Sequence, residues 1–183
     1  MRQRVARSVR GFSLIELLLT VSVAATLMAI SVPLLNKLSD STKLTNTTDQ
    51  VEREMQTAKL RSVSTNTTMR FRTNCPSTGY YRIVEVLGTS ADTAASRCNP
   101  ATYPFKTTGV DFASPPNFDG VLRQLLDGAT VTTATIEFHP DGTAWDASSG
   151  TATAISSSLT VTVSRNGLSK NITLNSLGKI LVQ

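Results

Sequence analysis

Three hydrophobic patterns follow one another along the chain. Leu17–Leu35 is a run of 19 residues without a charged side chain. As an α-helix it would be roughly 28 Å long, close to the hydrocarbon thickness of a bilayer, about 30 Å. Residues 36–63 are polar, with apolar positions at seven-, four- and three-residue steps, and the chain beyond residue 64 alternates like β-strands. These patterns predict an α+β protein, in which a long N-terminal hydrophobic helix packs on an antiparallel β-sheet domain.

We expect one helix from Phe12 to about Ser62. Residues 12–35 would lie in a membrane or filament core, and residues 36–63 would continue the helix as an amphipathic segment on a globular domain of residues 64–183. The apolar stripe of this second half consists of Leu44, Val51, Met55 and Ala58. Pro33 removes a helical hydrogen bond, so it is expected to kink the helix without ending it. The alternative is a membrane helix followed by a separate, solvated helix.

The sequence beyond residue 64 is typical of a domain built from β-strands. Alternation predicts strands at Thr68–Arg72 and Tyr80–Leu87, and then a long surface connection over residues 88–120. A further strand is expected at Val131–His139, where it ends in the turn His139–Gly142.

The last third of the chain contains the clearest hairpin. Residues 159–164 alternate apolar and polar side chains, and Asn166-Gly167 is typical of a tight hairpin turn. The return strand includes residues 172–174, and Ile180–Val182 is expected to form a last short strand. Ahead of the hairpin, residues 147–158 are a low-complexity stretch that we expect to be a mobile loop.

Positive charge is concentrated at the N-terminus. The chain has a net charge of +5, and four arginines within residues 1–11 supply +4 of it. The remaining side chains therefore carry +1. Basic residues beside an apolar span mark its cytoplasmic side, so this charge is weak evidence for binding to nucleic acid.

A short motif stands where the hydrophobic run begins. Gly11 is followed by Phe12, and Glu16 is the only charge between Phe12 and Asn36. This junction resembles the type III signal of type IV pilins and pseudopilins. The resemblance implies that a prepilin peptidase cuts after Gly11, removes residues 1–11 as a leader and methylates the new N-terminal Phe12.

An ordinary secretory signal peptide or signal anchor is the competing interpretation. A signal peptide also joins a basic region to an apolar core, but that core usually spans about 7–15 residues and precedes the cleavage site. Here the run is longer and the junction lies ahead of it, which favours the pilin-type signal.

Glu16 requires a partner if it enters an apolar environment. A carboxylate there costs on the order of 2–3 kcal/mol by insertion scales. The resemblance implies that Glu16 pairs with the methylated amine of a neighbouring subunit during assembly. The alternative is a carboxylate favoured by the helix dipole near the start of the helix, with water close by.

Cys75 and Cys98 are the two cysteines of the chain. A domain outside the cytoplasm lies where disulfides persist, so we expect the pair to form a bridge. The alternative is two separate thiols.

No catalytic pattern is found in the sequence. The single histidine, His139, stands beside a turn proline, and we interpret it as a surface or structural residue. Asp141 and Asp146 flank one loop, but two carboxylates alone make a poor Ca²⁺ site. We therefore expect no enzymatic activity, cofactor or metal.

Patterns in the C-terminal part of the chain make the resemblance to the pilins more specific. The pattern Ile-x-Phe-x-Pro-x-Gly at residues 136–142 and the closing Gly178-Lys179-Ile180 are similar to the GspH/FimT family of minor pseudopilins. Some FimT-like members carry a Gly-Arg-x-Arg motif implicated in DNA binding. Residues 178–181 supply one cation there, Lys179, which argues against DNA binding in this chain.

One basic patch keeps the DNA hypothesis as an alternative. Arg70 and Arg72 are two apart on a predicted strand, so they share a face, and Arg82 lies on the next strand. With Lys179 they would form a small surface that contacts phosphates. The competing interpretation is a solvated sheet face diluted by acids such as Glu85.

The resemblance leads us to expect a minor pilin in the tip or initiation complex of a type IV pilus. The chain would be held in the bacterial inner membrane with its C-terminal domain in the periplasm. Its partners would be other pilins or pseudopilins, the prepilin peptidase and the inner-membrane assembly platform. The alternatives are a GspH-like pseudopilin of the type II secretion system and a DNA-binding minor pilin for natural transformation.

Overall fold

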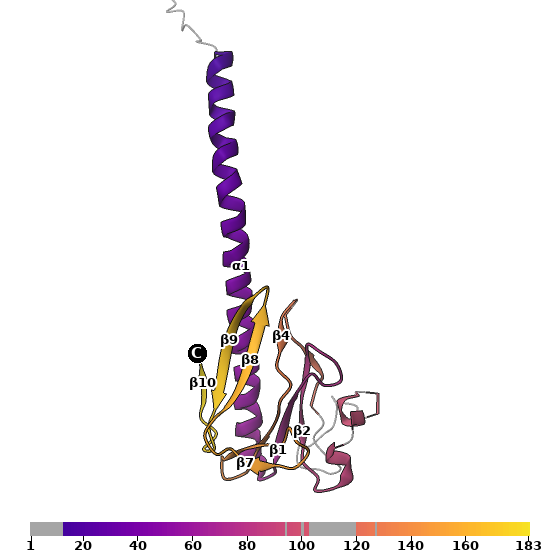
Figure 1. Cartoon of the computed structure of the whole chain (residues 1–183). Coiled ribbons are helices and arrows are strands. Elements are labelled where there is room, and N and C mark those ends of the chain that lie inside the picture. The colour runs from indigo at the N-terminus through magenta and orange to yellow at the C-terminus, as the bar shows by residue number, and fades with distance from the viewer. Residues whose placement is uncertain (1–12, 94, 100, 103–119, 127) are drawn as a thin grey trace, which may run out of the picture. The chain divides into compact units, whose positions relative to one another are not determined.

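The computed structural model of the chain describes residues 13–93, 95–99, 101–102, 120–126 and 128–183. The predicted cleavage and methylation positions, Gly11 and Phe12, lie outside these residues. The chain divides into two compact units, residues 1–39 and residues 40–183. One helix, α1 (Leu14–Thr65), contributes residues to both units (Figure 1).

The α1 helix confirms the single long helix that the sequence predicted. It begins after Ser13, whose carbonyl accepts hydrogen bonds from the amides of Glu16 and Leu17, each at 3.1 Å. The helical backbone continues through position 33, so the proline does not end it, and the kink stays a prediction. The alternative of two separate helices is wrong, because Leu14–Thr65 is one helix.

Within residues 40–183, the described strands form two antiparallel sheets. The six-stranded sheet has the order β3-β2-β1-β5-β6-β7, with β3 (Arg123–Gln124), β2 (Tyr80–Glu85), β1 (Met69–Thr73), β5 (Thr135–Phe138), β6 (Ala144–Asp146) and β7 (Thr153–Ala154). The four-stranded sheet has the order β10-β9-β8-β4, with β10 (Ile180–Val182), β9 (Leu168–Leu174), β8 (Leu159–Arg165) and β4 (Thr130–Val131).

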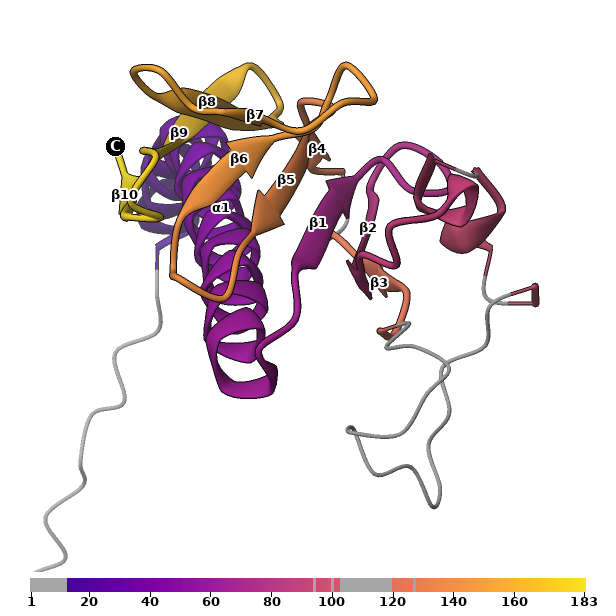
Figure 2. The same ribbon diagram turned by 90° about the horizontal axis from the view of Figure 1, so that it is seen from below.

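The hydrophobic core lies between α1 and these sheets. The four residues of the predicted stripe are all buried in it: Leu44, Val51, Met55 and Ala58. Phe71, Ile136 and Val161 supply buried side chains from β1, β5 and β8. Figure 1 shows the strands beside the lower part of α1, and Figure 2, which looks from below, shows them around one side of it. The helical period of the sequence therefore identified the packed face.

The hairpin and both predicted turns are confirmed. The strands β8 and β9 pair in register from Leu159↔Leu174 to Arg165↔Leu168. Asn166 and Gly167 connect them with φ angles of 47° and 80°, the left-handed values that a tight two-residue turn requires. At the His139–Gly142 turn, the Gly142 amide donates to the His139 carbonyl at 2.9 Å.

The expected strand over residues 131–139 is wrong, because the chain changes sheets within it. The strand β4 belongs to the four-stranded sheet and β5 to the six-stranded sheet. Between them, the Thr132 amide donates to the Thr162 carbonyl at 2.9 Å, and the Ala134 amide donates to the Thr73 hydroxyl at 2.7 Å. Each sheet thus binds one end of this connection, which an alternating sequence does not reveal.

Two segments expected to be irregular are more structured than predicted. Residues 147–158 contain β7, which pairs with Trp145 and Asp146 of β6. Residues 88–120 include two short 3-10 helices, η1 (Ser90–Thr93) and η2 (Ala95–Cys98), with Asp92 and Arg97 buried. A surface connection is therefore wrong for this part, and residues 103–119 lie outside the described residues.

Candidate functional site

The N-terminal part of α1 is the most exposed apolar surface among the described residues. From Leu14 to Leu38 its large apolar side chains are 51–77 % exposed. This part is long and apolar enough to cross a membrane. Glu16 is exposed in the first turn, where the helix dipole favours an acid. An apolar surface of this size is unfavourable in water, so we expect lipid or other protein to cover it.

Hydroxyl side chains in this part bond within the helix. Thr20, Ser22 and Thr26 donate to the carbonyls three residues earlier, and Ser31 donates to the carbonyl four residues earlier, at 2.8–2.9 Å. A hydroxyl that is satisfied by its own helix costs little in an apolar environment. The polar residues of the run are therefore compatible with lipid or with the packed interior of a filament.

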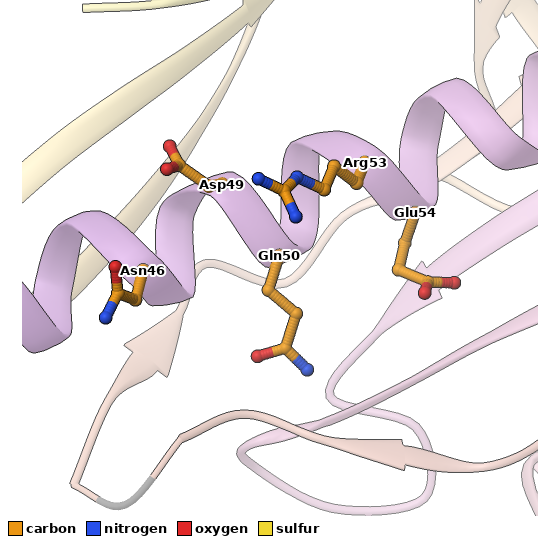
Figure 3. A pocket seen from close by; sticks show the side chains of 5 residues that line it. All are labelled: Asn46, Asp49, Gln50, Arg53 and Glu54. Carbon is orange, nitrogen blue, oxygen red and sulfur yellow. The ribbon is translucent and has the colours of Figure 1, made fainter.

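A shallow groove runs beside the domain-bound part of α1. Its lining residues come from successive turns of the helix (Figure 3): Asn46, Asp49, Gln50, Arg53 and Glu54. The Gln50 amide donates to the Tyr81 hydroxyl at 2.8 Å, and Glu54 Oε1 lies 3.2 Å from Arg123 Nε. No pattern in the sequence identified this groove.

Burial shifts the pKa values of two groups at the groove, Glu54 in its lining and Tyr81 next to it. Burial, together with the nearby Glu54 carboxylate, raises the pKa of Tyr81 to about 12. Burial also raises the pKa of Glu54, against the opposing effect of Arg123. The groove combines both signs of charge, and it contains no nucleophile–base pair among the residues that line it.

The predicted basic surface patch is wrong, although its three arginines do lie on neighbouring strands. Arg70 and Arg72 share one face of β1, and Arg82 of β2 lies directly opposite Arg72. Arg70 and Arg82, however, are only 7 % and 1 % exposed, so they cannot contact phosphates from solvent. Lys179 is exposed just before β10, in the other sheet.

The arginines belong instead to a buried ionic layer. Arg70 Nε donates to Glu137 Oε1 at 3.0 Å, and Arg70 also donates to the Asp92 carbonyl. Arg82 Nη1 donates to the Arg97 carbonyl at 2.7 Å, and Arg97 Nη1 donates to Asp92 Oδ1 at 2.9 Å. The η1 and η2 helices thus cover the face of the sheet that the sequence left exposed.

Asp92 also organises the backbone next to this layer. Its carboxylate accepts hydrogen bonds from the amides of Leu87, Gly88 and Thr89, at 2.8, 2.7 and 3.2 Å. Burial lowers the pKa of the neighbouring Arg72, and the charge of Arg70 lowers it further.

The predicted disulfide is present. Cys75 and Cys98 are bonded, with their Cα atoms 5.0 Å apart and a separation of 23 residues. Because Cys98 ends η2, the bond ties the cover of the ionic layer to the segment that precedes β2.

The remaining candidates for chemistry are structural. The ring of His139 packs against Trp145 with centroids 4.9 Å apart, and its Nε2 lies 3.8 Å from Glu137 Oε2. Asp141 accepts from the Thr143 amide and hydroxyl at 2.9 and 2.7 Å, and Asp146 accepts from the Ser148 amide. Within the part of the chain that the structure describes, no three His, Cys, Asp or Glu side chains gather as a metal site.

Comparison with known proteins identifies the N-terminal motif. Residues 6–32 match the family described as "Prokaryotic N-terminal methylation motif". This match confirms the resemblance to the type IV pilins at the start of the chain. The chain therefore combines the N-terminal methylation motif with a long helix packed on antiparallel sheets.

Two solved structures are similar in outline. Both are crystal structures of the type IV minor pilin FimU from Pseudomonas aeruginosa strain PAO1, each 14% identical to this chain. The likenesses cover 76% and 80% of this chain and 91% and 92% of FimU, with TM-scores of 0.42 and 0.46. No curated protein sequence matches the chain. The functional argument therefore rests on the motif and on the chain's own geometry.

Proposed function

We propose that the chain is a minor pilin, a structural subunit of the tip or initiation complex of a type IV pilus. The observation that carries this proposal is the exposed apolar helix from Leu14 to Leu38, most of which lies within the match to the methylation motif at residues 6–32. A surface of this kind has to be covered by lipid or by other helices. A subunit that moves from a membrane into a filament meets both environments in turn.

The proposed mechanism is assembly rather than catalysis. The chain waits in the inner membrane with residues 40–183 in the periplasm, and the prepilin peptidase removes residues 1–11 and methylates Phe12. The assembly platform then transfers the helix from lipid to the helices of other pilins. Both environments are apolar, so the transfer changes little in hydrophobic burial. Glu16 pairs with the methylated amine of a neighbouring subunit and sets the axial register.

The type II secretion alternative uses the same processing and the same helix, so it differs only in its partners. Cross-linking followed by mass spectrometry in the native host separates the two: pilus subunits support the pilus, and secretion pseudopilins support the alternative. The DNA-binding alternative loses its main support, because two of its four proposed contacts, Arg70 and Arg82, are buried.

Processing provides the first test. Co-expressed with a prepilin peptidase, the chain should lose residues 1–11 and begin at methylated Phe12. Intact-mass measurement reads both changes at once. A bulky residue in place of Gly11 should block the cut, and that variant is the control. Cleavage behind the apolar run, near Pro33, would instead identify an ordinary secreted protein.

Glu16 provides the second test. Glu16→Ala should still be cleaved and held in the membrane, because removal of a charge makes the span more apolar. Its recovery with neighbouring pilins should fall at least tenfold, since the incoming amine loses its partner. Thr20→Ala, one helical turn away, is the matched control. Recovery of Glu16→Ala at the wild-type level would contradict the pairing role.

A further inference from the structure

Exposure along α1 changes between Asp40 and Leu44. The described side chains from Ser13 to Ser39 are exposed, and so are residues 41–43, whereas Asp40 is half-buried. The buried stripe begins one turn later, at Leu44. Asp40 is also the first residue of the compact unit 40–183. It therefore marks the point at which α1 joins the globular domain.

The β8–β9 hairpin binds Asp40 through Arg165, the residue that precedes the turn residue Asn166. Arg165 Nε donates to Asp40 Oδ1 at 3.2 Å. A hydrogen bond from the Asn166 side chain is the main cause that lowers the pKa of the Asp40 carboxyl. Asn166 has a φ of 47°, which few residues other than glycine and asparagine adopt readily. The same asparagine thus forms the turn and lowers the pKa of Asp40 on the helix.

The domain is shaped to keep Arg165 at this position. Its side chain is only 9 % exposed, although it lies at the end of a hairpin. A Cβ atom at Gly128, where φ is +73°, would lie 3.1 Å from Arg165 Nη1, so the glycine makes room for the guanidinium. A buried guanidinium is costly unless a carboxylate neutralises it. Asp40 supplies that carboxylate from α1.

We propose that Asp40, Arg165 and Asn166 form a helix clasp, which fixes where the domain-bound part of α1 begins. The clasp keeps the free part of the helix at a constant length, from its processed end to Ser39. Arg165 and Asn166 are therefore positioning residues for assembly. The positioning role in assembly rests on the proposed pilin function, whereas the existence of the clasp does not.

Hydrogen exchange on the full chain in detergent micelles tests the clasp. In Asp40→Asn, amides of residues 40–47 should exchange about three- to fivefold faster, the size expected for one partly exposed ion pair. Residues 51–62 should be unchanged. Asn166→Gly keeps the turn but removes the side-chain donor, so it should produce a smaller change at the same amides. Asp49→Asn, on the same helix, is the matched control and should leave residues 40–47 unchanged.

Two results of the exchange measurement would contradict the clasp. Unchanged exchange at residues 40–47 in both clasp variants overturns the clasp, and so does an equal increase over the whole domain. Recovery of wild-type exchange in Asp40→Glu supports it, because the carboxylate is restored. If Asp40→Asn is fully processed but is recovered with other pilins at least twofold less than the wild type, the positioning role is supported. Normal recovery of a variant whose clasp has opened removes that role, whereas failed processing counts against the proposed function alone.

Discussion

The two faces of β1 are buried by opposite means. Met69 and Phe71 point into the apolar core between α1 and the sheets. Arg70, on the other face, lies in the ionic layer with Glu137 and the cover formed by η1 and η2. Apolar burial is non-directional and tolerates a change of partner. A buried charge depends on particular atoms at particular positions, so the two faces should respond differently to the loss of one side chain.

The largest expected effect is the loss of one partner in the ionic layer. Glu137→Ala leaves the Arg70 guanidinium buried without its carboxylate, and this should lower the free energy of unfolding by about 3–5 kcal/mol. Urea unfolding followed by circular dichroism measures it. The double variant Arg70→Met with Glu137→Leu should lose less than the single variant, because no unpaired charge remains. A loss below about 1 kcal/mol for Glu137→Ala would show that the layer is effectively solvated.

The contrast also explains what the sequence could predict. The stripe of α1 and the Asn166-Gly167 hairpin depend on local periods and on one dipeptide, so both were correct. The ionic layer joins Arg70 to acidic and carbonyl partners 67 and 22 residues away. A strand with two arginines on one face looks solvent-exposed until the covering segment is known. Glu137 lies within the segment that was expected to be a strand, but nothing in its spacing indicated Arg70.

The same reasoning applies to the candidate site. The apolar helix and Glu16 were evident because they form a continuous run and an isolated charge. Asp40 gave no signal, since a polar residue at the end of an apolar run is ordinary. Its role depends on Arg165, which is 125 residues away. Pairings over such distances are set by the topology of the sheets, and a single sequence does not contain that information in readable form.

The second effect concerns the disulfide that ties the cover in place. Reduction, or Cys75→Ser with Cys98→Ser, should lower the free energy of unfolding by about 3 kcal/mol, because the unfolded chain regains the freedom of a loop of this size. Hydrogen exchange should rise over residues 86–99 and remain slow in residues 51–58 of α1. The double serine variant treated with reductant is the control. Equal loosening of both regions would mean that the ionic layer and the apolar core unfold as one unit.

The smallest expected effect is at Glu54, which lies at the boundary between the core and the groove. Burial raises the pKa of its carboxyl above the ordinary value of 4.5, so the folded state binds a proton more tightly than the unfolded state. The stability that this proton provides is complete below pH 4.5 and is lost as the pH rises through the raised pKa. The free energy of unfolding of Glu54→Gln should therefore match that of the wild type near pH 4 and exceed it at pH 7, by up to about 0.5 kcal/mol, since Arg123 offsets part of the cost of burial.

Tyr81 does not contribute to this pH dependence, because its pKa of about 12 keeps the hydroxyl neutral throughout. Urea unfolding at pH steps between 4 and 7.5 is the measurement, with Glu52→Gln on the same helix as the control. A variant less stable than the wild type at pH 7 would show that the ion pair with Arg123 outweighs the cost of burial. Glu54 would then stabilise the fold through its ion pair, as Glu137 does with Arg70, but by a smaller amount.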